Sequence, residues 1–395
     1  MNIRGLLLGG AVCLMSGSAM AATLTVGPGK TYPTVAAAVA ASANGDVIQV
    51  QTGTYTNDFV TITTNVTIEA VGGRVLEVAT VPLPSQKAIW IVGTAVTSPT
   101  VTIDGFDFSG AQTPFGSNGA GVLFQSGFLT LTNSSFHNDQ DGLRSGPIAV
   151  GSVLVDHCEF FNNGINDGLT HDVYVGIIPN FTIQNSYVHD ALGGHLIKSR
   201  ALNTTVINNR LFDNAGNTSY EIDVPQGGNL TVSGNIIQQG TASSNPNIIA
   251  YGEELVTQNP GTSIQVSDNT FVNDFTGSAP LGFWNQRTGM AFLTDNSFWG
   301  ITSPQVAGGT GPNTQVGNTF LGSRPALDTT SLPYKTVYGP VLNLSIINSK
   351  LAMLGLTLAT VPPGTVGGGG GIPAGAWVDA GGASITDDNG TAITD

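Results

Sequence analysis

All five histidines of this 395-residue chain fall within one stretch of the sequence: His137, His157, His171, His189 and His195. The same stretch and its immediate continuation hold four of the 12 lysines and arginines, namely Arg144, Lys198, Arg200 and Arg210. Charged residues make up only 10% of the chain, so this concentration favours a functional site. Polar ladders or ion-pair networks without a function would also cluster such residues, and that alternative stays open.

Three short segments around this cluster align with one another: His171–Gly176, His195–Arg200 and Tyr220–Pro225. If each is a β-strand, alternation directs Val173 and Val175, Ile197 and Ser199, and Ile222 and Val224 inward. The opposite, exposed face then carries Asp172, Tyr174, Lys198, Arg200, Glu221 and Asp223. Tyr174, Lys198 and Asp223 form one column on that face, and Arg144 joins it from the preceding segment.

These residue types suit β-elimination on a uronate sugar, in which a base removes the proton beside the carboxylate and an acid assists the leaving oxygen. Lys198 is the best candidate base, because a neighbouring cation such as Arg200 can lower the pKa of an amine. Arg200 or Arg144 is predicted to bind the carboxylate, and Tyr220 is a further candidate for substrate binding. The candidate proton donors are Tyr174, His171 and His195.

Three acidic side chains on the predicted face, Asp172, Glu221 and Asp223, could bind Ca²⁺, which prefers oxygen ligands. The alternative for each acid is a salt bridge to Lys198 or Arg200. For His171 and His195 the alternative is a structural role in a corner of the fold. No ligand spacing supports a zinc site at His137 or His157.

A repeated unit of short β-branched strands and Asn- or Gly-rich turns must position these groups. Its leading residues are Leu131, Val155, Ile183, Ile207, Val232, Val266 and Leu293, which are 24, 28, 24, 25, 34 and 27 residues apart. Such a period indicates a solenoid whose rungs stack to bury their apolar faces. The strand composition favours an all-β, right-handed parallel β-helix, and the step of 34 predicts a loop inserted after Gln239.

The segment from Thr31 to Asp46 reads as a short amphipathic helix ending at Asn44-Gly45, followed by a strand at Val47–Val50 and by Thr52-Gly-Thr-Tyr55. This resembles the N-terminal cap of pectate-lyase-like β-helix proteins, where a helix plugs the end of the solenoid. The run Ile197-Lys-Ser199, Asn203, Asn208-Asn209 and Gly216 resembles the alginate lyase and chondroitinase B family. That resemblance implies Lys198 as the base and Ca²⁺ as the group that neutralises the uronate. The family's arginine in the next rung has no match, since Asp223 or its neighbours stand there.

The first residues resemble a signal peptide: Arg4, an apolar run from Gly5 to Met15, and a cleavage site after Ala21. We therefore predict a secreted or periplasmic protein without a membrane span. The predicted regions are a signal peptide over 1–21, a cap over 22–45, a β-helix over 46–325, and a C-terminal cap with a Gly-rich tail over 326–395. In that last region Leu351 to Val361 is predicted to cover the C-terminal end of the solenoid. Cys158 is the one cysteine of the predicted mature chain, so no disulfide is expected within it.

Without Arg4 the chain has 11 basic residues against 26 acidic ones, a formal charge of −15, which makes nucleic acid an unsuitable partner. A polysaccharide is the expected partner, and a monomer is the expected state. The leading hypothesis is a polysaccharide lyase or a C5-epimerase acting on a uronate polymer. A glycoside hydrolase that uses Asp172, Glu221 or Asp223 as its carboxylates, and a non-catalytic carbohydrate-binding solenoid, are the alternatives.

Overall fold

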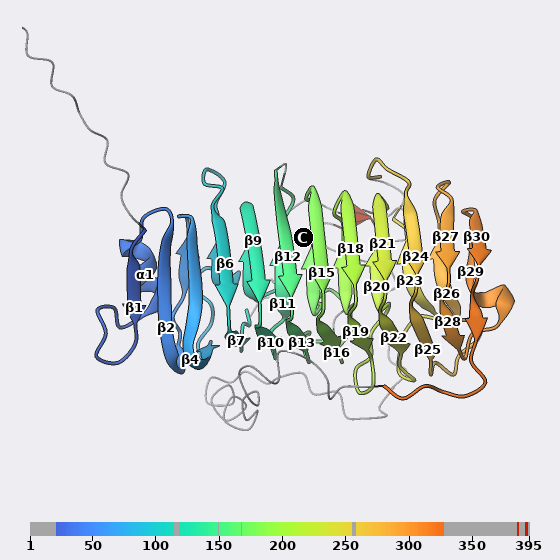
Figure 1. The fold of residues 1–395 in the computed structure, drawn as a ribbon, viewed down its shortest axis with the longest axis horizontal. Coiled ribbons are helices and arrows are strands. Elements are labelled where there is room, and N and C mark those ends of the chain that lie inside the picture. Colours follow the sequence, from blue (N-terminus) through green and yellow to red (C-terminus); the bar gives the residue numbers. More distant parts are fainter. Residues whose placement is uncertain are drawn as a thin grey trace, which may run out of the picture.

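The chain folds as a parallel β-helix in this computed structural model, which describes residues 21–113, 118–148, 150–166, 168–254 and 258–327 and two short strands near the C-terminus. Each rung contributes up to three strands, and every strand pairs in parallel with its equivalent in the next rung. Two runs of strands belong to one 21-stranded sheet, and a third forms a ten-stranded sheet. Figure 1 shows the first run as a row of parallel arrows along the long axis.

The strands of run 1 are β1 (Thr23–Val26), β2 (Asp46–Thr56), β4 (Val66–Val78), β6 (Thr100–Asp104), β9 (Gly127–Thr132), β12 (Gly151–Asp156), β15 (Asn180–Gln184), β18 (Asn203–Ile207), β21 (Asn229–Ser233), β24 (Ile264–Ser267), β27 (Ala291–Thr294) and β30 (Asn313–Val316). Those of run 2 are β7 (Phe106–Ser109), β10 (Ser135–His137), β13 (Glu159–Phe161), β16 (Tyr187–His189), β19 (Arg210–Phe212), β22 (Ile236–Gln239), β25 (Thr270–Asn273), β28 (Ser297–Trp299) and β31 (Thr319–Phe320). The second halves of the long strands β2 and β4 pair with each other, and that of β4 pairs with β7, so these two segments begin this run.

The ten-stranded sheet contains β3 (Val60–Ile62), β5 (Ala88–Val92), β8 (Ala120–Phe124), β11 (Asp141–Ser145), β14 (Val173–Val175), β17 (Ile197–Ser199), β20 (Ile222–Val224), β23 (Asn247–Tyr251), β26 (Leu281–Asn285) and β29 (Ala307–Gly309). A 3₁₀ helix, η1, covers Ser303–Gln305, and β32 (Ile385–Thr386) pairs antiparallel with β33 (Ala392–Ile393). None of the described helices is long and apolar enough to cross a membrane.

The core is built from columns of identical or similar side chains, because in-register stacking places equivalent residues above one another. Phe136 stacks on Phe108 and on Phe160, with ring centroids 5.1 and 4.6 Å apart. Val153 and Val155 of β12 point into the core, whereas the alternating residues Ser152 and Leu154 are partly exposed. This alternation is the pattern expected of a strand with one buried face.

A ladder of asparagines, buried except for the last, forms the corner between run 1 and run 2: Asn209, Asn235, Asn269, Asn296 and Asn318. Asn209 Oδ1 accepts the Ser186 N–H, and each later side-chain oxygen accepts the backbone N–H of the preceding asparagine, as in Asn209 N to Asn235 Oδ1 at 2.8 Å. The Asn235 amide donates to Asn269 Oδ1 and to the Val206 carbonyl, both at 2.9 Å. The ladder thus satisfies backbone groups that the tight turn would otherwise leave unpaired.

Helix α1 (Val35–Ala41) closes the N-terminal end, as predicted, although it is shorter than the sequence suggested. Val35, Ala38 and Val39 face the core. The Thr34 side chain accepts the Ala37 N–H, and the Asp58 carboxylate accepts those of Val35 and Ala36. Two capping side chains therefore accept the backbone N–H groups of the first turn, in a helix that would be too short to be stable alone.

The C-terminal rung ends the solenoid with polar side chains at core positions. Asn313 and Gln315 of β30 pair with the buried Ala291 and Leu293 of the previous rung. Gln315 donates a hydrogen bond to the Asn313 side chain at 3.0 Å. Phe320 continues the core aromatic column but is 48% exposed. The predicted cover from Leu351 to Val361 lies outside the described residues.

Buried carboxyl groups line the turns that lead from run 2 into the ten-stranded sheet. Burial raises the pKa values of Asp139, Asp172 and Glu221 well above their ordinary range. Burial, reinforced by the charge of Asp190, raises the pKa of Asp213 to about 7, although hydrogen bonds from Thr218 oppose the shift. Folding therefore favours the protonated form of these groups.

We predict that Asn235→Ala destabilises the protein by about 3 kcal/mol, since it leaves the buried Asn209 N–H without an acceptor. Asn203→Ala is the matched control, because Asn203 belongs to a partly exposed ladder with Asn180 and Asn229 and should cost only about 0.5 kcal/mol. Urea unfolding of the two variants measures the difference. Equal losses would contradict a structural role for the buried ladder.

The pH dependence of stability should follow the carboxyl groups. A folded-state pKa of about 7 against an ordinary value of 3.8 means that Asp213 stabilises the fold fully below about pH 3.8 and progressively less up to about pH 7. We expect the free energy of unfolding to fall from pH 5 to pH 8, and Asp213→Asn to reduce this fall by at most about 3 kcal/mol. An unchanged slope in Asp213→Asn would contradict this assignment.

Candidate functional site

The predicted column of polar side chains exists on the outer face of the ten-stranded sheet. Arg144 of β11 pairs with Tyr174 of β14, Tyr174 with Lys198 of β17, and Lys198 with Asp223 of β20. The intervening residues Val173, Ile197 and Ile222 belong to the core. Strand alternation and register together therefore bring one guanidinium, one phenol, one ammonium and one carboxylate into a line.

Lys198 lies at the centre of a buried ion-pair network. Its Nζ is 2.8 Å from Asp223 Oδ2 and 3.5 Å from Glu254 Oε1. His195 Nε2 approaches the same Asp223 oxygen at 2.9 Å. Burial alone would raise the pKa of Asp223, but the positive charge of Lys198 and the hydrogen bond from His195 outweigh burial and hold it well below its usual value.

Arg200 connects this network to Tyr174. Its guanidinium contacts both carboxylate oxygens of Glu254, with Nη2 2.8 Å from Oε1, and its Nε donates to the Tyr174 hydroxyl at 3.2 Å. Arg144 pairs with Asp141 at 2.8 Å and also lies over the Tyr174 ring, 4.8 Å from its centroid. Tyr174 therefore lies between two guanidinium groups.

The histidines predicted as proton donors form a stack beside the column. His171, His195 and Tyr220 lie with successive ring centroids 5.1 and 5.2 Å apart. The Nδ1 atom of each histidine accepts a backbone N–H of the next rung, from His195 and Tyr220 respectively. Burial lowers the pKa of both histidines, so each imidazole is neutral, with the proton on Nε2.

The structure does not bring the three predicted calcium ligands together. The Asp172 carboxylate accepts the side-chain N–H of Asn163 at 2.8 Å, and that of Glu221 accepts the Thr218 hydroxyl at 3.3 Å. Both residues precede their strands, where alternation no longer fixes the side-chain direction, so only Asp223 reaches the column. No group of three or more His, Cys, Asp or Glu side chains among the described residues could hold a metal ion.

Two further expectations about the column need correction. It was expected to be exposed, but Arg144, Lys198 and Asp223 are each at most 2% exposed. The neighbour of the Lys198 amine was expected to be the Arg200 cation, but two carboxylates contact this amine instead. The reason is Glu254, which lies between the ammonium and the guanidinium.

Sequence reasoning missed Glu253 and Glu254. They follow β23 in the loop between this strand and β24, and this loop, rather than the connection directly after Gln239 that was predicted, carries the extra residues of the longest repeat. Extending the strand alignment by one rung, to Asn247–Tyr251, would have located the strand that these acids follow, but not the path of the loop that brings them to the column. Burial and the charge of Asp223 raise the pKa of Glu253 well above its ordinary value, so Glu253 is the protonated partner of an ionised Asp223.

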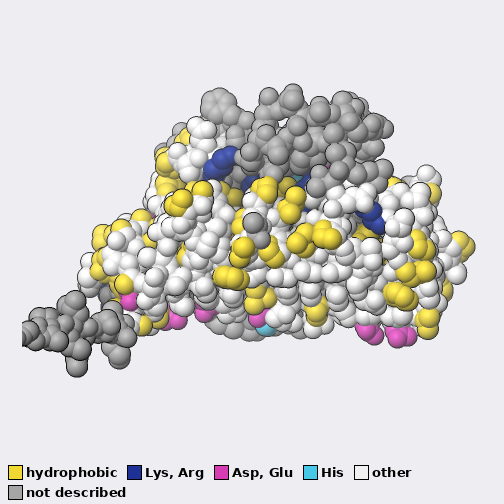
Figure 2. Space-filling view, turned by 90° about the horizontal axis from the view of Figure 1, so that it is seen from above, with side chains coloured by type: hydrophobic (Ala, Val, Ile, Leu, Met, Phe, Trp, Pro, Cys, Tyr) yellow, Lys and Arg dark blue, Asp and Glu magenta, His cyan; other side chains and the backbone are white. Residues whose placement is uncertain are grey.

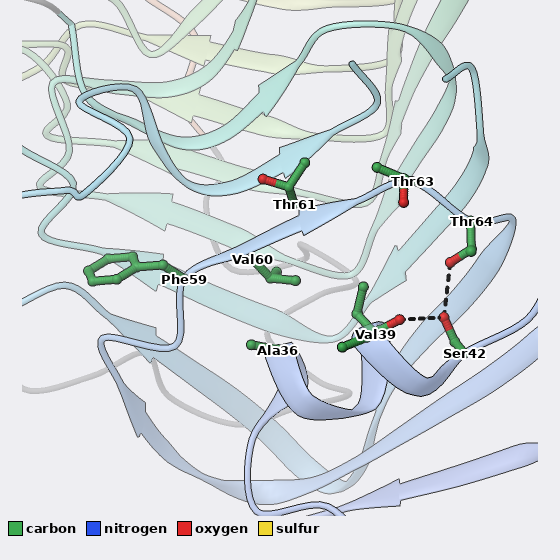
Figure 3. A pocket seen from close by; sticks show the side chains of 9 residues that line it. Ala36, Val39, Ser42, Phe59, Val60, Thr61, Thr63 and Thr64 are labelled. Atoms are coloured by element: carbon green, nitrogen blue, oxygen red, sulfur yellow. Dashed lines mark hydrogen bonds between the residues drawn. The ribbon is translucent and has the colours of Figure 1, made fainter. Parts of the chain in front are cut away.

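A separate hollow of about 340 Å³ lies between α1 and β3 at the N-terminal end (Figure 3). Its lining is Ala36, Val39, Ala40, Ser42, Phe59, Val60, Thr61, Thr63 and Thr64. Because no lining side chain titrates in the physiological range, this hollow has none of the groups needed for acid–base chemistry.

Figure 2 shows lysines and arginines on one long side of the molecule and acidic residues toward the opposite side.

The sequence model of the family described as "Right handed beta helix region" matches residues 87–320, more than half of the chain. It confirms the predicted fold and its handedness. No curated protein matches the chain.

Several solved structures are similar to this chain. Pectate lyase Pel9A is 13% identical, covers 80% of this chain and 84% of its own, and has a TM-score of 0.40. A PL6 family alginate lyase, AlyGC, is 15% identical, with coverages of 80% and 41% and a TM-score of 0.43. The surface protein and adhesin PfbA of Streptococcus pneumoniae is 14% identical, with coverages of 73% and 92% and a TM-score of 0.43. At such identities the likeness concerns the fold alone.

We predict that Asp223→Asn costs about 3–5 kcal/mol at pH 7, because it removes the nearer of the two carboxylates that compensate the buried Lys198 ammonium. Asp274→Asn is the matched control at the more exposed pair with Arg324, and should cost about 1 kcal/mol or less. Since the folded-state pKa of Asp223 is lowered, its contribution is present above the ordinary value of 3.8 and is lost as the pH falls below it. Urea unfolding at pH 7 and at pH 3 tests both points, and similar losses for the two variants would contradict the first.

Proposed function

This chain belongs to the right-handed β-helix family, and from that premise we propose that it is an exported protein that acts on a uronate-containing polysaccharide. The proposed reaction begins with removal of the proton beside the sugar carboxylate, as in a lyase or a C5-epimerase. The observation that carries this proposal is the column of Arg144, Tyr174, Lys198 and Asp223 with Arg200 beside it. It concentrates three cations and a phenol in a chain with only 12 lysines and arginines.

The first requirement of this chemistry is a partner for the sugar carboxylate, because neutralising it acidifies the adjacent C–H bond. Arg200 is the proposed partner, since a guanidinium binds a carboxylate through two parallel hydrogen bonds. Arg144 lies one rung beyond Tyr174 and is the proposed contact for the neighbouring sugar unit. Tyr220, on the histidine stack, is the proposed sugar platform.

The second requirement is a base, and here the contacts favour an exchange of the predicted roles. An ammonium that is ion-paired with Asp223 and Glu254 has no lone pair with which to accept a proton. Tyr174 lies between two guanidinium groups that stabilise a phenolate. We therefore assign the base to Tyr174 and the proton donor to Lys198.

In the proposed elimination, the Tyr174 phenolate takes the C5 proton and the C–H electron pair forms the C4–C5 double bond. The C4–O bond then breaks, and the departing oxygen receives a proton from Lys198. In the epimerase variant the bond stays intact and a proton returns to C5 from the opposite face. His171 and His195 are positioning residues here, because their Nδ1 atoms hold the backbone of neighbouring rungs. Calcium stays a prediction from family resemblance, and no step of this reaction depends on it.

The hydrolase alternative is less well supported. Glycosidases place two carboxyl groups about 5–10 Å apart on either side of the bond, whereas Asp172 and Glu221 contact Asn163 and Thr218 instead and only Asp223 of the predicted carboxylates lies on the column. A binding solenoid without turnover is the second candidate. The near-complete burial of Arg144, Lys198 and Asp223 favours it, because a polymer must displace their cover before any reaction.

The test is incubation of the protein with a panel of uronate polymers, followed by ultraviolet absorbance for the unsaturated product and by NMR for epimerised units. We expect turnover on one polymer class, and a fall of at least about 100-fold in kcat for Tyr174→Phe and Lys198→Met. Tyr251→Phe is the matched control, because it removes a buried hydroxyl whose hydrogen bond to Gly228 lies off the column.

Retention on a polymer column without either product would support the binding solenoid instead. New reducing ends without absorbance would support the hydrolase. Wild-type turnover that survives in Tyr174→Phe and Lys198→Met would overturn the assigned roles.

A further inference from the structure

Glu254 holds the Arg200 guanidinium in the way that a substrate carboxylate would. Both of its carboxylate oxygens contact the guanidinium, and Oε1 also lies 3.5 Å from Lys198 Nζ. The side chain is 5% exposed. A carboxylate fixed by two guanidinium contacts and an adjacent ammonium is the arrangement expected for bound uronate.

The backbone of Glu254 is anchored by contacts that do not involve its carboxylate. Its N–H donates to the Pro225 carbonyl at 3.0 Å, and its carbonyl accepts Arg287 Nη2 at 2.9 Å. Gly252, two residues earlier, donates its N–H to the Val224 carbonyl and has a φ of +77°, and a Cβ there would lie 2.3 Å from Arg287 Cγ. The carboxylate can therefore leave Arg200 by rotation of its own side chain while the backbone stays in place.

Replacement of this carboxylate by another one conserves the charge of a buried site. Loss of Glu254 from Arg200 without a substitute would leave a buried guanidinium uncompensated, which is strongly unfavourable. A uronate carboxylate compensates Arg200 and Lys198 again, whereas a neutral sugar does not. The exchange thus discriminates between acidic and neutral saccharides.

The contact also involves the proposed base. Arg200 donates through Nε to the Tyr174 hydroxyl while its other nitrogens hold Glu254. The same guanidinium therefore contacts both a carboxylate in the Glu254 position and the Tyr174 phenol, which would remove the proton beside that carboxylate.

We propose that Glu254 is an internal competitor, whose carboxylate occupies the subsite that receives the uronate carboxylate and must be displaced before substrate binds. This inference rests on the proposed function and names the regulation of the same site. While Glu254 occupies this subsite, the protein does not bind neutral saccharides. Acidic saccharides displace Glu254 to an extent that rises with their local concentration.

The experiment compares binding of D-galacturonate and of neutral D-galactose to wild type, Glu254→Ala and Glu254→Gln by calorimetry at pH 7. We expect Glu254→Ala to bind D-galacturonate at least about ten-fold more tightly than wild type, since no internal carboxylate competes. Glu254→Gln should show a smaller gain, because its amide keeps the shape of the competitor without its charge. D-galactose should gain nothing. Asp274→Ala, which frees Arg324 at a more exposed pair, is the matched control and should behave as wild type.

Chemical rescue gives a second readout if Glu254→Ala unfolds too readily for calorimetry. Acetate at increasing concentration should raise the melting temperature of Glu254→Ala more than that of wild type or of Asp274→Ala. Equal responses of all variants to D-galacturonate and to acetate would overturn the inference, and so would an equal gain for D-galactose. Both experiments measure binding and not turnover. If the binding results are as expected but no turnover is found, the proposed reaction is wrong while the role of Glu254 as a competitor is retained.

Discussion

In-register stacking of parallel rungs is the constraint from which the rest of this structure follows. Each strand hydrogen-bonds with its equivalent one rung away, so a residue's position within its repeat determines which side chains lie directly above and below it. The same rule produces the phenylalanine column of the core, the asparagine ladder at a corner, and the line from Arg144 to Asp223 on the outer face. In such a fold, the register between neighbouring strands determines which side chains come together in a site.

Register also explains which parts of the site were predictable from the sequence. The alignment of three short segments placed Tyr174, Lys198 and Asp223 in one column, and alternation assigned the core residues between them correctly. It failed for Asp172 and Glu221, which precede their strands and turn toward Asn163 and Thr218. Alternation holds only where the backbone is extended, and the sequence pattern does not mark where that begins.

The part of the site that was not predicted from the sequence lies in the loop that interrupts the repeat. Glu253 and Glu254 belong to the longest connection between the ten-stranded sheet and run 1, where no period predicts the path of the chain. Glu254 nevertheless determines the electrostatics of the column, because it pairs with Arg200 and approaches Lys198. A network of this kind is close to neutral and stable while complete, and any chemistry at it requires that one partner be exchanged.

The last rung has a consequence for the protein in concentrated solution. A parallel β-helix presents at its end a row of unpaired backbone groups and open core columns, the same features on which cross-β filaments grow. Here Asn313 and Gln315 place amide groups where apolar side chains would otherwise attract another chain, and they hydrogen-bond to each other along the same strand. Amide side chains in this rung disfavour stacking of a second solenoid on it, and apolar residues at the two positions would favour end-to-end polymerisation.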